Sequence, residues 1–143
     1  MKDWLAELGG WLVWLATNKV VLLSVGGAAG TNARYWLGVW INSQRWAEST
    51  GFLGTMIVNV SGSLILGFAG GLFLERMPPG HRNWFLLIGT GFCGGYTTFS
   101  TFEYETFKLV QDGSWGLAAV NVFVSVAAGF FAVALAFSLA SRG

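Results

Sequence analysis

Four apolar segments dominate the sequence, and each is close to the length of a membrane-spanning helix. They cover residues 20–40, 52–74, 84–109 and 115–139. Because about 20 apolar residues cross the hydrocarbon core of a bilayer, each segment can form one span. Charged residues make up only 10% of the chain, whereas a soluble domain carries about 25%. The sequence therefore predicts an all-α membrane protein with four transmembrane helices.

The polar residues exclude several classes of partner and cofactor. The formal net charge is only +1 and the eight Lys and Arg residues are scattered, so no surface suits a nucleic acid. Cys93 is the single cysteine, which rules out an intrachain disulfide and a multi-cysteine zinc site. With His81 as the single histidine, the chain cannot assemble a conventional metal cluster from its side chains.

Residues 1–18 precede the first apolar segment and form a separate N-terminal extension. Trp4, Leu8, Trp11 and Leu15 recur at helical spacing, which predicts an amphipathic helix at the membrane interface. A flexible extension is the alternative interpretation. The extension is short and acidic and lacks a small-residue cleavage site, so we expect it to be retained. Residues 19–143 then form the four-helix domain.

The basic residues are divided almost evenly between the two predicted ends of the bundle. An even number of spans places both chain termini on one side of the membrane. The basic residues on that side are Lys2, Lys19, Arg76, Arg82 and Arg142, and those on the other are Arg45, Lys108 and Arg34 at the edge of its span. So small a difference leaves the chain free to insert in either orientation, although a single orientation fixed by the termini is the alternative.

The third apolar segment contains a run of glycines and hydroxyl residues at its centre, GFCGGYTTFSTF at 91–102. Glycine is a poor helix former, and a hydrocarbon environment offers no water to exposed backbone groups. This run therefore predicts a broken helix whose free carbonyls and hydroxyls face protein or a water-filled cavity. Irregular backbone at this depth is typical of ion-binding sites in membrane proteins.

Small and polar residues also form stripes on the other segments. On the second segment they recur every four residues, at Thr55, Asn59, Ser63, Gly67 and Gly71. For Ser63 and the two glycines we favour helix packing, because small residues let backbones approach closely. An amide near the midplane is costly without a partner, so Asn59 is either part of a pore or a packing lock.

The fourth segment repeats this arrangement with Asn121, Ser125 and Gly129. Stripes on all four helices would more than fill the interior of one bundle, which predicts a homodimer. On the first segment, Arg34 must pair with a carboxylate, reach the interface or face water, and Glu103 and Glu105 are candidate partners. A cation at a vestibule would also concentrate anions there.

Phe99 and Phe102 lie three residues apart, directly after the predicted break. They therefore share one helical face. Membrane phenylalanines commonly face lipid or fill a core. A ring edge also carries partial positive charge, so the pair can attract an anion while offering no site to cations.

Three motifs, in this order on the first three segments, resemble the CrcB or Fluc family of fluoride channels. They are GGAAGTNARY at 26–35, GTMIVNVSGS at 54–63 and GFCGGYTTFSTF at 91–102. The resemblance covers the chain from about Val20 onward. It implies a dual-topology, antiparallel homodimer in a bacterial inner membrane, with two fluoride pathways. It also implies one central sodium ion, Na+, held by main-chain carbonyls at the two third-helix breaks.

The resemblance assigns roles to particular residues of this sequence. Phe99 and Phe102 match the phenylalanines that line the fluoride path, Asn59 matches the asparagine facing them, and Thr55 lies one turn earlier. Gly94 and Thr97 match the positions whose carbonyls bind sodium. Hydroxyls such as those of Ser100 and Ser125 add donors to the path, while Arg34 and Glu105 belong to the vestibule. Glu103 departs from the small residue common in the family.

Two other classes of membrane protein are alternatives. A four-helix dual-topology multidrug transporter usually needs a membrane-embedded carboxylate to couple protons, and no Asp or Glu lies in the middle of a segment. A membrane enzyme needs a nucleophile with a nearby base, but Cys93 has no histidine near it in sequence. The sequence therefore favours a passive channel over a transporter or an enzyme.

Overall fold

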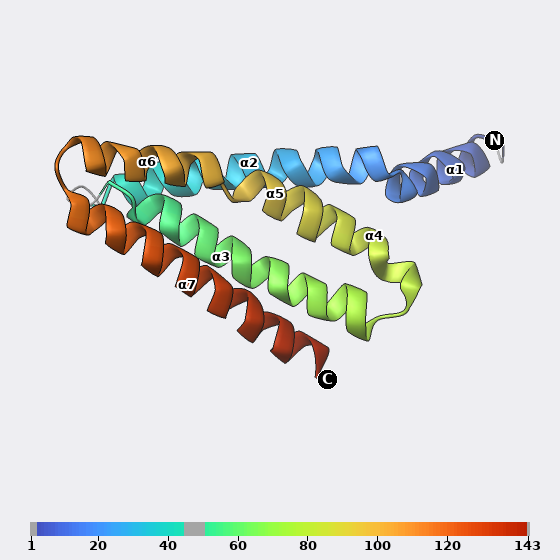
Figure 1. Cartoon of the computed structure of the whole chain (residues 1–143). Helices are drawn as coiled ribbons and strands as arrows, with labels where there is room; N and C mark the ends of the chain where they lie inside the picture. Colours follow the sequence, from blue (N-terminus) through green and yellow to red (C-terminus); the bar gives the residue numbers. More distant parts are fainter. Residues whose placement is uncertain (1–2, 45–50, 143) are drawn as a thin grey trace.

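The computed structural model describes residues 3–44 and 51–142, and its regular elements within these ranges are all helical (Figure 1). The predicted all-α architecture is confirmed for this part of the chain. Lys2, Arg45 and Glu48, two of which entered the predicted charge balance, lie outside the described residues.

One long helix lies in the N-terminal extension, and the other three follow apolar segments closely. They are α1 (Asp3–Thr17), α2 (Lys19–Asn42), α3 (Leu53–Gly70), which continues as the π-helix η1 (Gly71–Arg76), and α7 (Trp115–Ser141). Leu53–Arg76 and Trp115–Ser141 are each long and apolar enough to cross a membrane. The pair Leu8–Thr17 and Lys19–Asn42, bent by 69°, is a third candidate when taken as one span. Four spans, including the interrupted third segment, remain a prediction.

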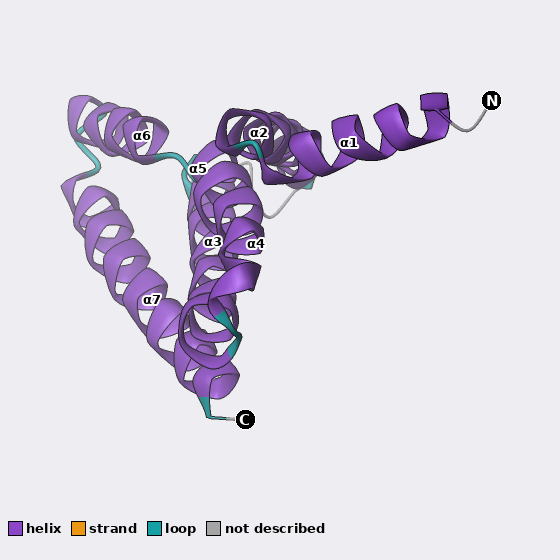
Figure 2. Ribbon diagram, turned by 90° about the vertical axis from the view of Figure 1, so that its right-hand side faces the viewer, coloured by secondary structure: helices purple, strands orange, loops and turns teal. Residues whose placement is uncertain are grey.

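The third apolar segment is divided into short helical pieces. After the 3-10 turn η2 (Pro79–His81) come α4 (Arg82–Phe85), the π-helix η3 (Leu86–Phe92), α5 (Cys93–Tyr96) and α6 (Phe99–Gln111). Thr97 and Thr98 between α5 and α6 are extended, with ψ angles of 158° and 112° (Figure 2). The predicted helix break is confirmed and falls at these two threonines.

Glycines on α3 and η1 allow α7 to pack closely against them. A Cβ atom on Gly67 would lie 2.9 Å from Val133 Cα, and one on Gly71 would lie 2.6 Å from the Phe137 carbonyl oxygen. The facing alanines of α7, including Ala136, are buried. Gly67 and Gly71 therefore serve helix packing, as the stripe on the second segment predicted.

A second glycine contact joins α2 to the pieces of the third segment. Cβ atoms on Gly26 and Gly30 would each lie 2.8 Å from a backbone nitrogen, that of Phe92 and that of Tyr96 respectively. From the other side, a Cβ on Gly95 would lie 3.0 Å from Thr31 Oγ1. The backbone of the third segment is thus fixed against α2 directly before the break.

Candidate functional site

Asn59 of α3 binds the backbone at the break. Its Oδ1 accepts a hydrogen bond from the Thr98 N–H at 2.7 Å, and its Nδ2 donates to the Thr98 carbonyl at 3.1 Å. One amide therefore pairs both the N–H and the carbonyl of an extended residue. Leaving these two groups unpaired in an apolar environment would be costly. Of the two predicted roles of Asn59, the packing lock is present in the structure.

The Thr98 side chain begins the next helix. Its Oγ1 accepts a hydrogen bond from the Thr101 N–H at 3.3 Å and donates to Thr101 Oγ1 at 2.9 Å. This is an N-cap, in which a hydroxyl oxygen takes the place of the missing carbonyl partner at a helix start. Thr98 thus ends one helical piece through its backbone and starts the next through its side chain.

These hydrogen bonds release two main-chain carbonyls. In an α-helix, the Gly94 carbonyl would accept from the Thr98 N–H and the Thr97 carbonyl from the Thr101 N–H. Both N–H groups donate to side-chain oxygens instead, those of Asn59 and Thr98. Gly94 and Thr97 are the two residues for which the family resemblance implies cation-binding carbonyls.

A groove of about 460 Å³, the phenylalanine groove, opens beside the break. Its lining includes Asn59, Ser63, Thr98, Phe99, Phe102, Ser125 and Phe130. The Phe99 and Phe102 ring centroids are 5.8 Å apart, and the ring planes are inclined by 35°. Phe99 is 70% exposed, so its ring borders an open space and is not part of the core of this chain. The structure therefore brings together four of the predicted path residues, Asn59, Phe99, Phe102 and Ser125.

A second groove of about 430 Å³, the arginine groove, lies on the other side of Thr98. Its lining includes Thr31, Arg34, Asn42, Thr55, Thr98, Thr101 and Glu105. The predicted vestibule residues Arg34 and Glu105 thus share one cavity with Thr55. Because Thr98 lines both grooves, the break lies between a space that contains charged side chains and a mainly apolar one.

Glu105 is anchored by Thr55, whose Oγ1 donates a hydrogen bond to Glu105 Oε1 at 2.8 Å. The second carboxylate oxygen, Oε2, is buried and has no hydrogen-bond partner. Glu103, by contrast, is exposed and lines neither groove. Ser100 is also exposed and is absent from both linings, so its proposed place on the path remains a prediction.

Three polar contacts near the site were not predicted. Asn121 Nδ2 donates to Thr106 Oγ1 at 2.8 Å, and Ser125 Oγ donates to Asn121 Oδ1 at 3.1 Å, which ties α6 to α7 beside the phenylalanine groove. The Tyr96 hydroxyl lies 2.9 Å from Ser61 Oγ, at the end of α5. The four-residue spacing of Asn121 and Ser125 was visible in the sequence, but the positions of Thr106, Ser61 and Tyr96 opposite their partners were not.

Side-chain metal ligands do not cluster in the part of the chain that the structure describes. No group of three or more His, Cys, Asp or Glu residues within 3–44 and 51–142 could hold a metal ion. The released carbonyls of Gly94 and Thr97 suit a hard cation such as Na+, since such ions prefer oxygen ligands.

Comparison with known proteins places the chain in a family. Residues 21–137 match the family described as "CrcB-like protein, Camphor Resistance (CrcB)". The chain belongs to this family. Relatives include proteins named "Fluoride-specific ion channel FluC" from Solibacter usitatus, 44% identical over 87% of this chain and 99% of the relative, and from Pyrococcus furiosus, 41% identical over 87% and 98%. A third, from Oceanobacillus iheyensis, is 38% identical over 84% of this chain and 87% of the relative.

Proposed function

We propose that this protein is a fluoride-selective channel that exports fluoride passively across the bacterial inner membrane. The observation that carries the proposal is the phenylalanine groove, where the Asn59 amide, the Ser125 hydroxyl and two phenylalanine rings surround one space next to a helix break. CrcB-family relatives named as fluoride-specific channels support the choice of ion. This function is that of a channel and not of an enzyme.

The lining of the phenylalanine groove suits a small, strongly hydrated anion. Fluoride gives up water only where several hydrogen-bond donors or positive ring edges replace it. The Asn59 amide has a second N–H besides the one that binds the Thr98 carbonyl, and the Ser63 hydroxyl also lines the groove. The residues that line this groove include no charged side chain. A bare cation in the groove would bind fluoride too tightly for rapid passage, because conduction requires that the ion also leave.

The route that we propose runs from the arginine groove past Thr98 to the phenylalanine groove. Arg34 attracts the anion into the first space, and electrostatic attraction of this kind raises the local concentration of an ion. Thr98 lines both spaces, so an ion that passes the break meets this residue in each of them. Phe99 and Phe102 then present their rings along the second space.

The channel is proposed to be an antiparallel, dual-topology homodimer with four spans in each chain and two pathways. The protomer leaves the backbone beside the break uncovered at Gly94, which is exposed and where an added Cβ atom would meet nothing within 4 Å. The phenylalanine groove is likewise open at Phe99. A second copy that packs against this face would enclose both the groove and the released carbonyls.

A structural sodium ion at the centre of that dimer is part of the proposal. The Gly94 and Thr97 carbonyls fit such an ion, because the N–H groups that would pair with them are bound elsewhere. When bound, sodium would supply positive charge that offsets four carbonyl dipoles facing one another in a low dielectric. The protein's part is to hold these oxygens in place through the Asn59 and Thr98 hydrogen bonds.

Fluoride release from liposomes tests the proposed function. The purified protein is reconstituted into vesicles loaded with potassium fluoride, and a fluoride electrode records release after valinomycin is added. We expect rapid fluoride release and no comparable chloride release from vesicles loaded with potassium chloride. Vesicles that retain fluoride as protein-free vesicles do, or that release both anions equally, would contradict the proposal.

A further inference from the structure

Helix α1 stands apart from the rest of the molecule (Figure 2). It meets α2 at an angle of 69°, and the family match begins only after it, at residue 21. The bend is a defined structure, since Asn18 Oδ1 accepts hydrogen bonds from the Val20 and Val21 N–H groups at 3.0 and 3.2 Å. The Asn18 N–H in turn donates to the Trp14 carbonyl, so the backbone remains paired through the bend.

The larger apolar face of α1 is not covered by the part of the chain that the structure describes. Leu8, Trp11, Leu12 and Leu15 share this face by helical spacing, and their exposed fractions are 47%, 64%, 64% and 42%. Gly10 and Thr17 lie on the opposite face together with Val13 and Trp14, which are 63% and 50% exposed, so that face is smaller and only partly apolar. Four large apolar side chains left exposed on one helix face mark a binding surface for another apolar phase.

The direction of α1 follows from the length of α2. With 24 residues, α2 is about 36 Å long at about 1.5 Å per residue, enough to cross a hydrocarbon core of about 30 Å. When α2 crosses the bilayer near its normal, the 69° bend directs α1 close to the membrane plane. If α1 lies in the membrane plane at the boundary between acyl chains and headgroups, one of its faces meets acyl chains and the other meets headgroups and water.

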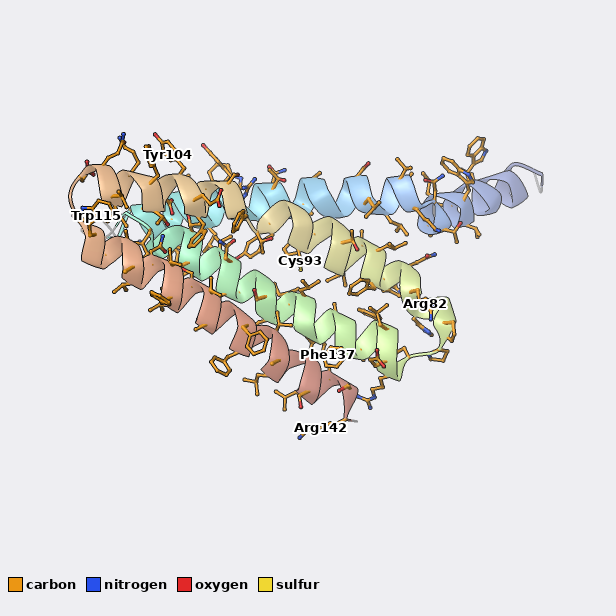
Figure 3. The ribbon with its side chains drawn as sticks, viewed as in Figure 1. Arg82, Cys93, Tyr104, Trp115, Phe137 and Arg142 are labelled. Atoms are coloured by element: carbon orange, nitrogen blue, oxygen red, sulfur yellow. The ribbon has the colours of Figure 1, made fainter. Side chains whose placement is uncertain are left out.

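Charge at this end of the molecule supports the same placement. The first residue of α2, Lys19, is exposed next to α1. Arg82 and Arg142 lie toward one end of the bundle, whereas Trp115 lies at the other (Figure 3). Arg76 directly precedes the connection to α4, and all four basic side chains are exposed, with Glu75 as the neighbouring acid. Basic side chains at the level of the headgroups attract lipid phosphates.

We infer that α1 is an anchor that lies in the bilayer interface, with the face formed by Leu8, Trp11, Leu12 and Leu15 in the acyl boundary. Its partner is the lipid bilayer, and the exposed basic residues contact the phosphate groups at the same level. Tryptophan is a typical residue of this region because its ring is apolar and its N–H is polar. In a dual-topology dimer, one such anchor would lie on each side of the membrane.

Spin labels on α1 of the full-length protein test this inference. Because Cys93 is the single cysteine, a Cys93→Ala background accepts one new cysteine at a time. Labels at Leu8, Leu12 and Leu15 report the apolar face, and labels at Gly10 and Thr17 report the other. Gly10 has room for a side chain, since a Cβ there meets nothing within 4 Å. Accessibility to oxygen and to a water-soluble nickel chelate is measured in liposomes that contain anionic lipid.

We expect the three leucine positions to be accessible to oxygen and shielded from nickel, and the two opposite positions to be accessible to nickel. Nickel access at all five would place α1 in water, and shielding from nickel at all five would place it within the hydrocarbon. Leucine positions shielded from both reagents would be covered by protein, such as a second copy of the chain. Each of these three results overturns the inference, and none depends on fluoride transport.

A second inference concerns the hydrogen bonds at the break and rests on the proposed sodium ion. We propose that Asn59 and Thr98 are positioning residues for the cation, because they hold the two N–H groups that would otherwise pair with the Gly94 and Thr97 carbonyls. Without the Thr98 hydroxyl, the Thr101 N–H is free to rejoin the Thr97 carbonyl and extend α6 by one residue. The cation would then lose an oxygen ligand.

The sodium dependence of the unfolding temperature separates this role from a merely structural one. Thr98→Val removes the helix-capping hydroxyl, and Thr101→Val is the matched control, since it removes a neighbouring hydroxyl but leaves the Thr101 N–H bound to Thr98. We expect the unfolding temperatures of the wild type and of Thr101→Val to be higher in sodium chloride than in choline chloride, and by the same amount. Thr98→Val should need at least about tenfold more sodium for the same shift, and Thr98→Ser should restore the wild-type response.

Two results would overturn this second inference, and they differ in what else they affect. A wild-type sodium response in Thr98→Val would show that the cap does not position the carbonyls, while leaving the sodium site itself intact. If the wild type unfolded at the same temperature in sodium chloride and in choline chloride, the protein would have no stabilising sodium site, and the positioning role would fall as well. Neither result bears on whether fluoride is transported.

Discussion

Asn59 and Thr98 are joined by a pair of hydrogen bonds in which one side-chain amide binds both polar groups of one backbone residue. The Thr98 N–H donates to Asn59 Oδ1 at 2.7 Å, and Asn59 Nδ2 donates to the Thr98 carbonyl at 3.1 Å. Asn59 also lines the phenylalanine groove. The same amide can therefore fix the break and border the proposed ion path.

Replacing Asn59 by Asp should block fluoride efflux. The carboxylate keeps an acceptor for the Thr98 N–H but loses the donor to the Thr98 carbonyl, and it adds negative charge to the groove. A repulsion of about 4 kcal/mol, expected for charges about 4 Å apart at a protein surface, lowers the rate roughly a thousandfold. The measurement is fluoride-electrode efflux, with size-exclusion chromatography to establish that the dimer forms.

Asn32→Asp is the matched control for this change. Asn32 is exposed on α2, lines neither groove, and donates only to the Ala28 carbonyl of its own helix at 2.8 Å. This variant should transport at nearly the wild-type rate. If folded Asn59→Asp and Asn32→Asp protein both released fluoride at the wild-type rate, the ion path would not pass Asn59.

Gly67→Ala should destabilise the protein through the contact between α3 and α7. The added methyl group would lie 2.9 Å from Val133 Cα, a backbone atom that cannot move without shifting the helix. Overpacking of this kind costs about 1–3 kcal/mol and should lower the unfolding temperature. Gly70→Ala is the control, because its methyl group meets the Phe137 ring at 3.5 Å and the Phe85 ring at 3.9 Å, both at ordinary contact distance. If the unfolding temperature fell by the same amount in Gly67→Ala and Gly70→Ala, this account of the packing would be contradicted.

The helices and the break could be predicted from local sequence. Apolar length predicts where α2, α3 and α7 lie, since hydrocarbon requires a continuous apolar stretch. The run of glycines and threonines predicts an interruption because it weakens the helix over several residues. It does not predict that the break falls at Thr97 and Thr98, since that position depends on Asn59, 39 residues away in the sequence.

The site could be predicted only in part, because several of its contacts join residues that are far apart in the sequence. Asn59, Phe99 and Phe102 share a groove as their positions around the break indicated. The hydrogen bond from Thr55 to Glu105 joins two residues 50 positions apart, and no periodicity encodes such a pair. Asn121 is almost fully buried, at 1% exposed, because Thr106 and Ser125 satisfy its amide, which became visible only once α6 and α7 were packed together.

Labelling from one side of the membrane tests dual topology. Single cysteines replace Gly80 and Gly116 in the Cys93→Ala background, since a Cβ at either glycine meets nothing within 4 Å. The helices between them run from one end of the bundle to the other (Figure 1). An impermeant maleimide added to intact cells should label a similar fraction of each variant. Full labelling of one position and none of the other would establish a single orientation.

The central claim is that fluoride passes along the rings of Phe99 and Phe102, and fluoride efflux from liposomes tests it most directly. Wild type is compared with Phe99→Leu, Phe102→Leu and the control Phe123→Leu, which alters a ring that is 75% exposed on α7 and outside the groove. The account predicts that Phe99→Leu and Phe102→Leu each lower the rate about tenfold, which corresponds to roughly 1.4 kcal/mol of lost attraction between ion and ring edge. Phe123→Leu should leave it unchanged. Wild-type efflux from all three variants as folded dimers would contradict the account.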